Sequence, residues 1–112
     1  MNEEGITMAT PILSARHTLY TGTDEQLDAY DMCATVVVTN ASAATLDIPD
    51  DSVVDFPLGT TVIVVQGGAG AVTVTADGDA TVTGTTLVTA TAGDQVYLVK
   101  YAANKWGAQV GT

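Results

Sequence analysis

Short runs of valine and threonine, separated by clusters of turn-forming residues, most limit what this chain can fold into. Of its 112 residues, 19 are Thr and 15 are Val. Their β-branched side chains are stiff at χ1 and fit a pleated sheet better than a helix. Gly, Asp, Asn and Pro interrupt the runs, and no segment of useful length reads as a helix. The sequence therefore predicts one all-β domain, for which 112 residues are enough.

The turn residues divide the chain after residue 33 into seven or eight short segments. Strands are expected at residues 34–39, 45–48, 61–66, 71–76, 81–83, 86–90, 95–101 and 105–110. The run from Thr61 to Gln66 predicts a strand buried on both faces, and Asp77-Gly78 predicts a tight hairpin. This spacing is typical of a compact antiparallel β-sandwich or barrel. Because no fixed long period relates the Val-Thr runs, a solenoid is not predicted.

Residues 1–33 lack this alternation and form a separate predicted region, an extended N-terminal arm before a β-domain at residues 34–112. The arm carries the only Arg and the only His of the chain. Within it we expect a short strand from Arg16 to Tyr20 and one helical turn with Thr23 as N-cap. A flexible leader is the alternative. Ile12-Leu13 favours the arm, because a disordered leader does not need an apolar pair.

The charge of the chain excludes several classes of partner. Three basic residues against 13 acidic ones give a formal net charge of −10. Nucleic acid needs Lys and Arg as partners for its phosphates, and an anionic membrane repels an acidic chain, so neither is expected to bind. The start resembles no signal peptide, and the longest apolar run is too short to span a bilayer. We therefore expect a soluble protein made in the cytoplasm, with its acids in the arm and turns.

No residues form a convincing catalytic or cofactor site. Cys33 is the only cysteine, which excludes an intrachain disulfide and fits a reducing compartment. Together Cys33 and His17 cannot supply four zinc ligands, and we expect Cys33 to be a small buried hydrophobe. The Gly-rich residues 66–70 precede a predicted strand, which favours a hairpin loop over a phosphate-binding loop. We expect no enzymatic activity and no cofactor.

A calcium ion is considered at two acidic turns, one with Asp50, Asp51 and Asp55 and the other with Asp77 and Asp79, which flank Gly78. Asp50, Asp51 and Asp55 are close in sequence, and carboxylate oxygens are the ligands that Ca²⁺ prefers. Their spacing does not match an EF-hand, and Asp is common in turns. Solvated turn residues are the favoured interpretation, and a calcium site is the alternative.

Three aromatic residues near the C-terminus allow two interpretations. Tyr97 and Tyr101 share one face of a predicted strand by the two-residue period. In one interpretation they form with Trp106 an aromatic surface for a sugar ring. In the other, which we favour, Trp106 packs across the final hairpin. Lys100 points to the opposite face from the tyrosines, and we expect an exposed base or an intersubunit salt-bridge partner.

A set of residues between positions 34 and 110 resembles a small β-rich module found in virion structural proteins of tailed bacteriophages. The resembling residues are Asn40, Leu46 to Pro49, Ser52 to Thr60, Val62 to Gly70, Val72, Val74 and Leu98 to Trp106. In this stretch Phe56-Pro57 reads as a plug followed by a rigid turn, and Gly59 permits a positive φ. Such modules occur in tail fibres and in head decoration proteins, and the arm is outside the resemblance.

The resemblance implies a structural role in the virion. For an acidic chain of this size we expect a capsid decoration (cement) protein, a homotrimer on the outer capsid surface that binds the major capsid protein. The residues expected to tie the arm to the capsid are Ile6, Met8, Ile12 and Leu13. The alternative is a tail- or head-fibre module that binds a host-surface glycan or protein through Tyr97, Tyr101 and Trp106.

Overall fold

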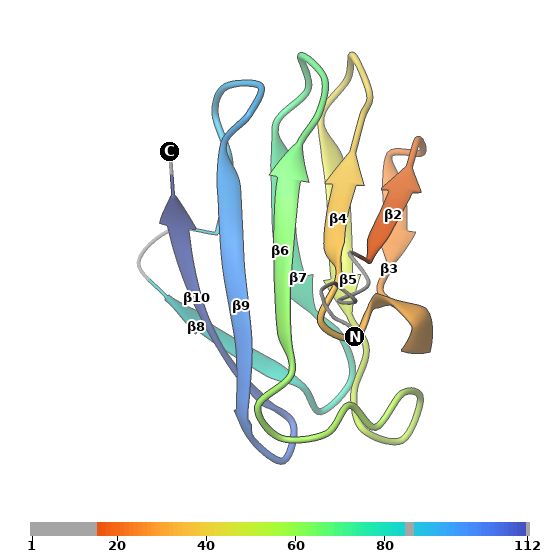
Figure 1. Ribbon diagram of the computed structural model, residues 1–112, viewed down its shortest axis with the longest axis vertical. Helices are drawn as coiled ribbons and strands as arrows, with labels where there is room; N and C mark the ends of the chain where they lie inside the picture. The colour runs from red at the N-terminus through yellow and green to blue at the C-terminus, as the bar shows by residue number, and fades with distance from the viewer. Residues whose placement is uncertain (1–15, 85–86, 112) are drawn as a thin grey trace, which may run out of the picture.

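The computed structural model describes residues 16–84 and 87–111, which form a compact all-β body of two facing sheets (Figure 1). The strands are β2 (His17–Tyr20), β3 (Asp24–Gln26), β4 (Thr35–Val38), β5 (Ala44–Ile48), β6 (Thr61–Gln66), β7 (Val72–Ala76), β8 (Thr81–Gly84), β9 (Gln95–Ala102) and β10 (Lys105–Gly111). The larger sheet has the order β2-β4-β6-β9-β10-β8 and the smaller one β3-β5-β7. A 3-10 turn, η2 (Ala29–Asp31), is the only helical element among the described residues.

Strands β2 to β7 form three coils of a β-solenoid. The chain passes along the larger sheet, turns, returns along the smaller sheet and begins the next coil beside the first, with a right-handed sense (Figure 1). The strands of successive coils are parallel in both sheets. In the larger sheet Leu19 pairs with Val37 and Val37 with Val65. In the smaller sheet Leu46 pairs with Val74.

The C-terminal third of the chain closes one end of this stack. Strand β9 runs antiparallel to β6, and β10 runs antiparallel to β9. Strand β8 completes the larger sheet beside β10, to which it is parallel. On the smaller sheet, Val88 forms an isolated antiparallel bridge with Thr73. Both edges left by the third coil are therefore covered. At the other end, β2 and β3 are the terminal strands of their sheets within residues 16–84 and 87–111.

The predicted all-β class is confirmed, but the predicted antiparallel sandwich or barrel is wrong, and so is the exclusion of a solenoid. The coils differ in length, which hides the repeat: His17 pairs with Thr35, 18 positions later, whereas Thr35 pairs with Ile63, 28 positions later. The longer coil contains the loop at residues 49–60. Asp77-Gly78 does make a turn, but β7 and β8 belong to different sheets and do not form a hairpin.

Strict alternation of side chains builds the core between the sheets. Inward residues of the larger sheet are Val36, Val38, Val62, Val64, Val96 and Leu98, and those of the smaller sheet are Ala44, Leu46, Ile48, Val72 and Val74. Phe56 and Trp106 add an edge-to-face pair with ring centroids 5.5 Å apart, so the plug predicted at Phe56 is confirmed. In β6 only alternate residues are fully buried, so the prediction of a strand buried on both faces is wrong.

The Gly-rich residues 66–70 form the turn of the third coil, stacked on the turn of the second. A Cβ atom on Gly70 would overlap the Ser42 carbonyl oxygen, and one on Gly68 would lie 2.7 Å from the Asn40 carbonyl oxygen. The Gly70 amide donates to that Asn40 oxygen at 2.8 Å. Close approach of two backbones, rather than phosphate binding, explains these glycines. The segment joins two sheets, so it is not the hairpin loop that was expected.

Most of the described part of the predicted arm belongs to the folded body. Strands β2 and β3 form the first coil, and Leu27 is fully buried in the core. The strand expected from Arg16 to Tyr20 is confirmed, but residues 24–26 are a strand instead of a helical turn. The capping box is formed by Asp28 and Asp31 around η2. The proposed capsid-binding residues Ile6, Met8, Ile12 and Leu13 lie outside the described residues.

Candidate functional site

The outward side of the larger sheet, called here the outer face, is apolar and free of acidic residues. Strands β2, β4, β6, β8, β9 and β10 contain no Asp or Glu. Because alternate residues point inward, the others form the outer face. Its apolar side chains are Leu19, Val37, Ile63, Val65, Tyr97, Val99 and Tyr101, of which Leu19, Tyr97, Val99 and Tyr101 are exposed.

Register makes these side chains continuous across the sheet. Leu19, Val37 and Val65 lie in one row across β2, β4 and β6. Ile63 pairs with Tyr97 across β6 and β9 in a second row. Neighbours in such rows are close enough for their side chains to pack. An apolar patch without acidic side chains that crosses several strands is typical of a protein interaction site.

The outward side of the smaller sheet is polar by contrast. Asp24 pairs with Thr45 and Thr45 with Thr73 along one row of β3, β5 and β7. In the next row Asp47 pairs with Thr75, whose hydroxyl donates to the Asp47 carboxylate. The two sheets therefore share a core but differ in their outward sides. The outward side of the smaller sheet is polar and suits contact with water, whereas that of the larger sheet is apolar and suits contact with a partner.

A shallow cavity interrupts the outer face at Gly107. It has a volume of about 240 Å³ and is lined by Tyr97, Val99, Gly107, Ala108 and Gln109. Gly107 pairs with Val99 on one side and with Thr83 on the other. A Cβ atom on Gly107 would meet only the Tyr101 ring, at an ordinary contact distance of 4.0 Å. Packing within the chain thus does not require glycine at this position.

The structure separates the three aromatic residues that the sequence grouped. Tyr97 and Tyr101 share the outer face, as predicted. Trp106 is only 1% exposed and packs against Phe56. It is therefore not part of an aromatic surface with the tyrosines. Trp106 pairs with Lys100 across the final hairpin, but its ring packs against Phe56, which comes from the loop at residues 49–60.

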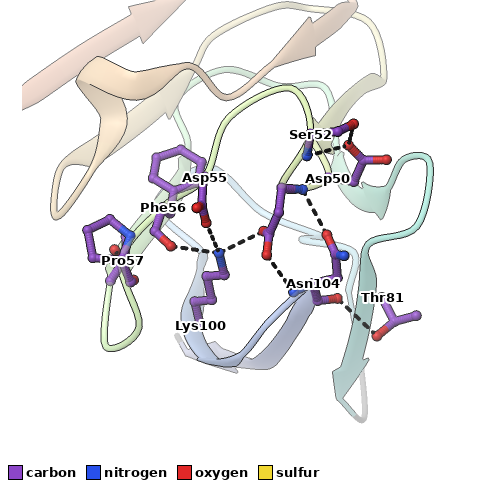
Figure 2. A network of polar contacts seen from close by, with 10 residues as sticks. Asp50, Ser52, Asp55, Phe56, Pro57, Thr81, Lys100 and Asn104 are labelled. Carbon is purple, nitrogen blue, oxygen red and sulfur yellow. Dashed lines mark hydrogen bonds and ion pairs between the residues drawn. The ribbon is translucent and has the colours of Figure 1, made fainter.

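Lys100 lies in the interior, which corrects the expectation of an exposed base or an intersubunit partner. Its side chain is 1% exposed, and its ammonium group donates to Asp51 Oδ1 at 2.7 Å, to Asp55 Oδ1 at 3.2 Å and to the Phe56 carbonyl oxygen at 2.6 Å (Figure 2). Three acceptors use the three N–H donors of the ammonium group. The sequence correctly placed Lys100 on the strand face opposite the tyrosines. Because that face is buried and a buried Lys is almost always paired, acidic partners for Lys100 could have been expected from the sequence.

The Lys100 network fixes the loop at residues 49–60 to the turn between β9 and β10. The Asp51 amide donates to Asn104 Oδ1 at 2.8 Å, and the Asn104 amide donates back to Asp51 Oδ2 at 3.1 Å. Burial lowers the pKa of Lys100, but the hydrogen bonds and charges of Asp51 and Asp55 outweigh it, so the pKa is raised above its ordinary value. Lys100 is therefore a cation that locks the loop.

The three carboxylates considered for calcium in the loop at residues 49–60 have other partners. Asp51 and Asp55 face Lys100. Asp50 accepts from the Ser52 hydroxyl at 2.5 Å and from the Asp79 amide at 3.0 Å, and the Ser52 hydrogen bond lowers its pKa (Figure 2). In the part of the chain that the structure describes, no three His, Cys, Asp or Glu side chains are grouped to hold a metal ion.

A second buried polar pair lies in the first coil. The Tyr20 hydroxyl donates to Asp31 Oδ2 at 2.6 Å, and the Asp28 amide donates to the same oxygen at 3.0 Å. Burial and the adjacent Asp31 carboxylate raise the pKa of Tyr20. Cys33, close to this pair in sequence, is exposed with a φ of 56°, so the prediction of a buried cysteine is wrong.

Comparisons with family models, with curated proteins and with solved structures find no match to this chain. Over residues 16–84 and 87–111, no helix has the length and hydrophobicity needed to cross a membrane.

Proposed function

We propose that this chain is a capsid decoration protein of a tailed bacteriophage, a homotrimer that binds the major capsid protein on the outer surface of the head. It acts as a structural protein and not as an enzyme. The observation that carries this proposal is the separation of charge: an acid-free apolar sheet face on a chain of net charge −10. The likeness of residues 34–110 to phage virion modules supplies the virion context.

Two physical features of the folded body suit a protein that stabilises a capsid by burying additional interface area between its subunits. Most of its core residues are Val or Ala, which remove less area from water per residue than larger side chains, so burial at an interface adds to the stability of the domain. The Lys100 network keeps the loop at residues 49–60 in one conformation. In this proposal the sheet face closes the oligomer, and the arm residues Ile6, Met8, Ile12 and Leu13 tie it to the capsid.

Incubation of the purified protein with phage heads that lack it tests this function. Saturable binding at three-fold or quasi-three-fold positions supports the proposal, and absence of binding refutes it. Deletion of residues 1–13 is expected to abolish capsid binding while the oligomer persists. Binding that survives this deletion contradicts the role given to the arm.

A fibre module that binds a host-surface glycan or protein is the second candidate. The exposed Tyr97 and Tyr101 beside the Gly107 cavity favour it, because tyrosine rings suit carbohydrate and protein contacts. Adsorption of the purified protein to host cells distinguishes the two functions, since a decoration protein does not adsorb to cells and a fibre module does.

A further inference from the structure

We propose that the outer face of the six-stranded sheet is a contact between copies of this chain, and that the Gly107 cavity receives a side chain of the second copy. This deepens the proposed function by assigning the self-contact, yet the contact itself does not depend on a virion. Three independent observations lead to it: the distribution of charge, the size of the face and an unexplained glycine.

Charge favours a second copy over a partner of opposite charge. The acids of the described residues lie on the smaller sheet, on η2 and in the turns, as with Asp24, Asp47 and Asp94. A basic partner is drawn toward those acids and not toward the outer face. Two copies of a chain with net charge −10 repel each other least where acids are absent from both surfaces. The outer face is such a surface, and the outer faces of two copies are both apolar, so they are compatible with each other.

The face is large enough for a stable contact. Six strands at about 4.8 Å spacing, with about five residues per strand on average at about 3.3 Å, give a flat footprint of about 500 Å². Side-chain relief makes the accessible area larger than this footprint. A standard interface buries about 800 Å² on each partner. With this side-chain relief, the outer face approaches the area that a stable oligomer needs.

Gly107 provides the third observation. Glycine in the interior of a strand is unfavourable and often marks a place where another molecule approaches closely. Neither a positive φ nor a neighbour within the chain requires it here. Tyr97 lines the cavity, and the ring of Tyr101, which is 56% exposed, lies 4.0 Å from the position of a Cβ atom on Gly107. An exposed ring next to a hollow on one face allows the ring of one copy to enter the hollow of another copy.

The molar mass in solution, measured by light scattering during size-exclusion chromatography, tests the contact. Wild-type protein at micromolar concentration is expected at three times its chain mass of 11.4 kDa. Val99→Asp places a carboxylate on the face and is expected to raise the dissociation constant at least about 100-fold. Val53→Asp is the matched control, because Val53 is also an exposed valine, at 64% against 41% for Val99, but lies in the loop at residues 49–60. Monomeric wild type, or equal behaviour of the two variants, overturns the proposal.

Gly107→Val separates assembly from folding. A Cβ atom at position 107 meets only the Tyr101 ring at 4.0 Å, and the adjoining cavity of about 240 Å³ has room for the two methyl groups of valine, so the melting temperature of the dissociated protein is expected to stay the same or rise. Assembly is expected to be lost. A Gly107→Val protein that still forms the oligomer refutes the role of the cavity. An assembly that is intact but does not bind phage heads refutes the proposed function and leaves the self-contact standing.

Discussion

Replacement of Lys100 by alanine is expected to destabilise the fold by about 3 kcal/mol, because three losses add. The side chain is 1% exposed, so removing three buried methylene groups costs about 2 kcal/mol. The Phe56 carbonyl oxygen loses its donor, which costs about 1 kcal/mol. Asp51, 22% exposed, loses a partial ion pair of about 1 kcal/mol, and Asp55, 78% exposed, loses almost nothing. The alanine variant no longer has the desolvation cost of a buried ammonium group, and this difference offsets about 1 kcal/mol of the loss.

Lys100→Met isolates the polar part of this cost. Methionine keeps the buried length of the side chain, so the expected loss is only about 1 kcal/mol. Lys105→Ala is the matched control: Lys105 is an exposed lysine of the adjacent strand, and its removal is expected to cost less than about 0.5 kcal/mol.

Urea unfolding followed by fluorescence measures these differences. Trp106 is the only tryptophan and is buried, so its emission reports the folded core. With a slope of about 1.5 kcal/mol per molar urea, Lys100→Ala is expected to lower the midpoint by about 2 M. Protein concentration is kept low and constant, because association adds to apparent stability. A midpoint for Lys100→Ala that matches Lys105→Ala refutes the buried position of Lys100.

Two further sets of substitutions test the stacking of the turns between coils and the Tyr20–Asp31 hydrogen bond of the first coil. Gly70→Ala is expected to cost at least about 2 kcal/mol in urea unfolding, because its Cβ overlaps the backbone of the adjacent turn, whereas Gly107→Ala is expected to be neutral or stabilising by up to about 1 kcal/mol. Equal costs contradict the stacking of the turns. The raised pKa of Tyr20 means that its contribution is complete below its ordinary value of 10.0 and is lost as pH rises. Unfolding free energy is thus expected to fall above pH 10 less steeply in Tyr20→Phe than in wild type, and parallel curves argue against the Tyr20–Asp31 pair.

The local pattern of apolar, threonine and turn residues in the sequence was enough to locate most of the strands, but it did not predict which strands pair. Alternation of Val with Thr placed β4, β5, β6, β7, β9 and β10 within one or two residues of their observed bounds. Pairing depends on contacts between distant residues, and the pairing of Thr35 with Ile63 is hidden because the loop at residues 49–60 lengthens one coil. The glycines of residues 66–70 carried a signal for stacked backbones, but a hairpin loop uses the same residues.

The candidate site could be predicted only in part, because the local pattern gives the direction of a side chain on its own strand but not its neighbours from distant segments. The two-residue period placed Tyr97 and Tyr101 on one face and Lys100 on the other, and the structure confirms both. The partners of Lys100 were missed because they come from a loop whose path no local pattern sets. The outer face as a whole was also missed, since it exists only when β2, β4, β6 and β9 lie side by side.

Hydroxyl-radical footprinting of the tyrosines tests most directly whether the outer face is where this chain meets another copy. Tyr101 and Tyr30 are both well exposed in the single chain, at 56% and 79%, but only Tyr101 lies on the outer face. As protein concentration rises through the range of association, oxidation of Tyr101 relative to Tyr30 is expected to fall severalfold. A constant ratio, in a sample whose molar mass shows assembly, contradicts the account and places the contact elsewhere.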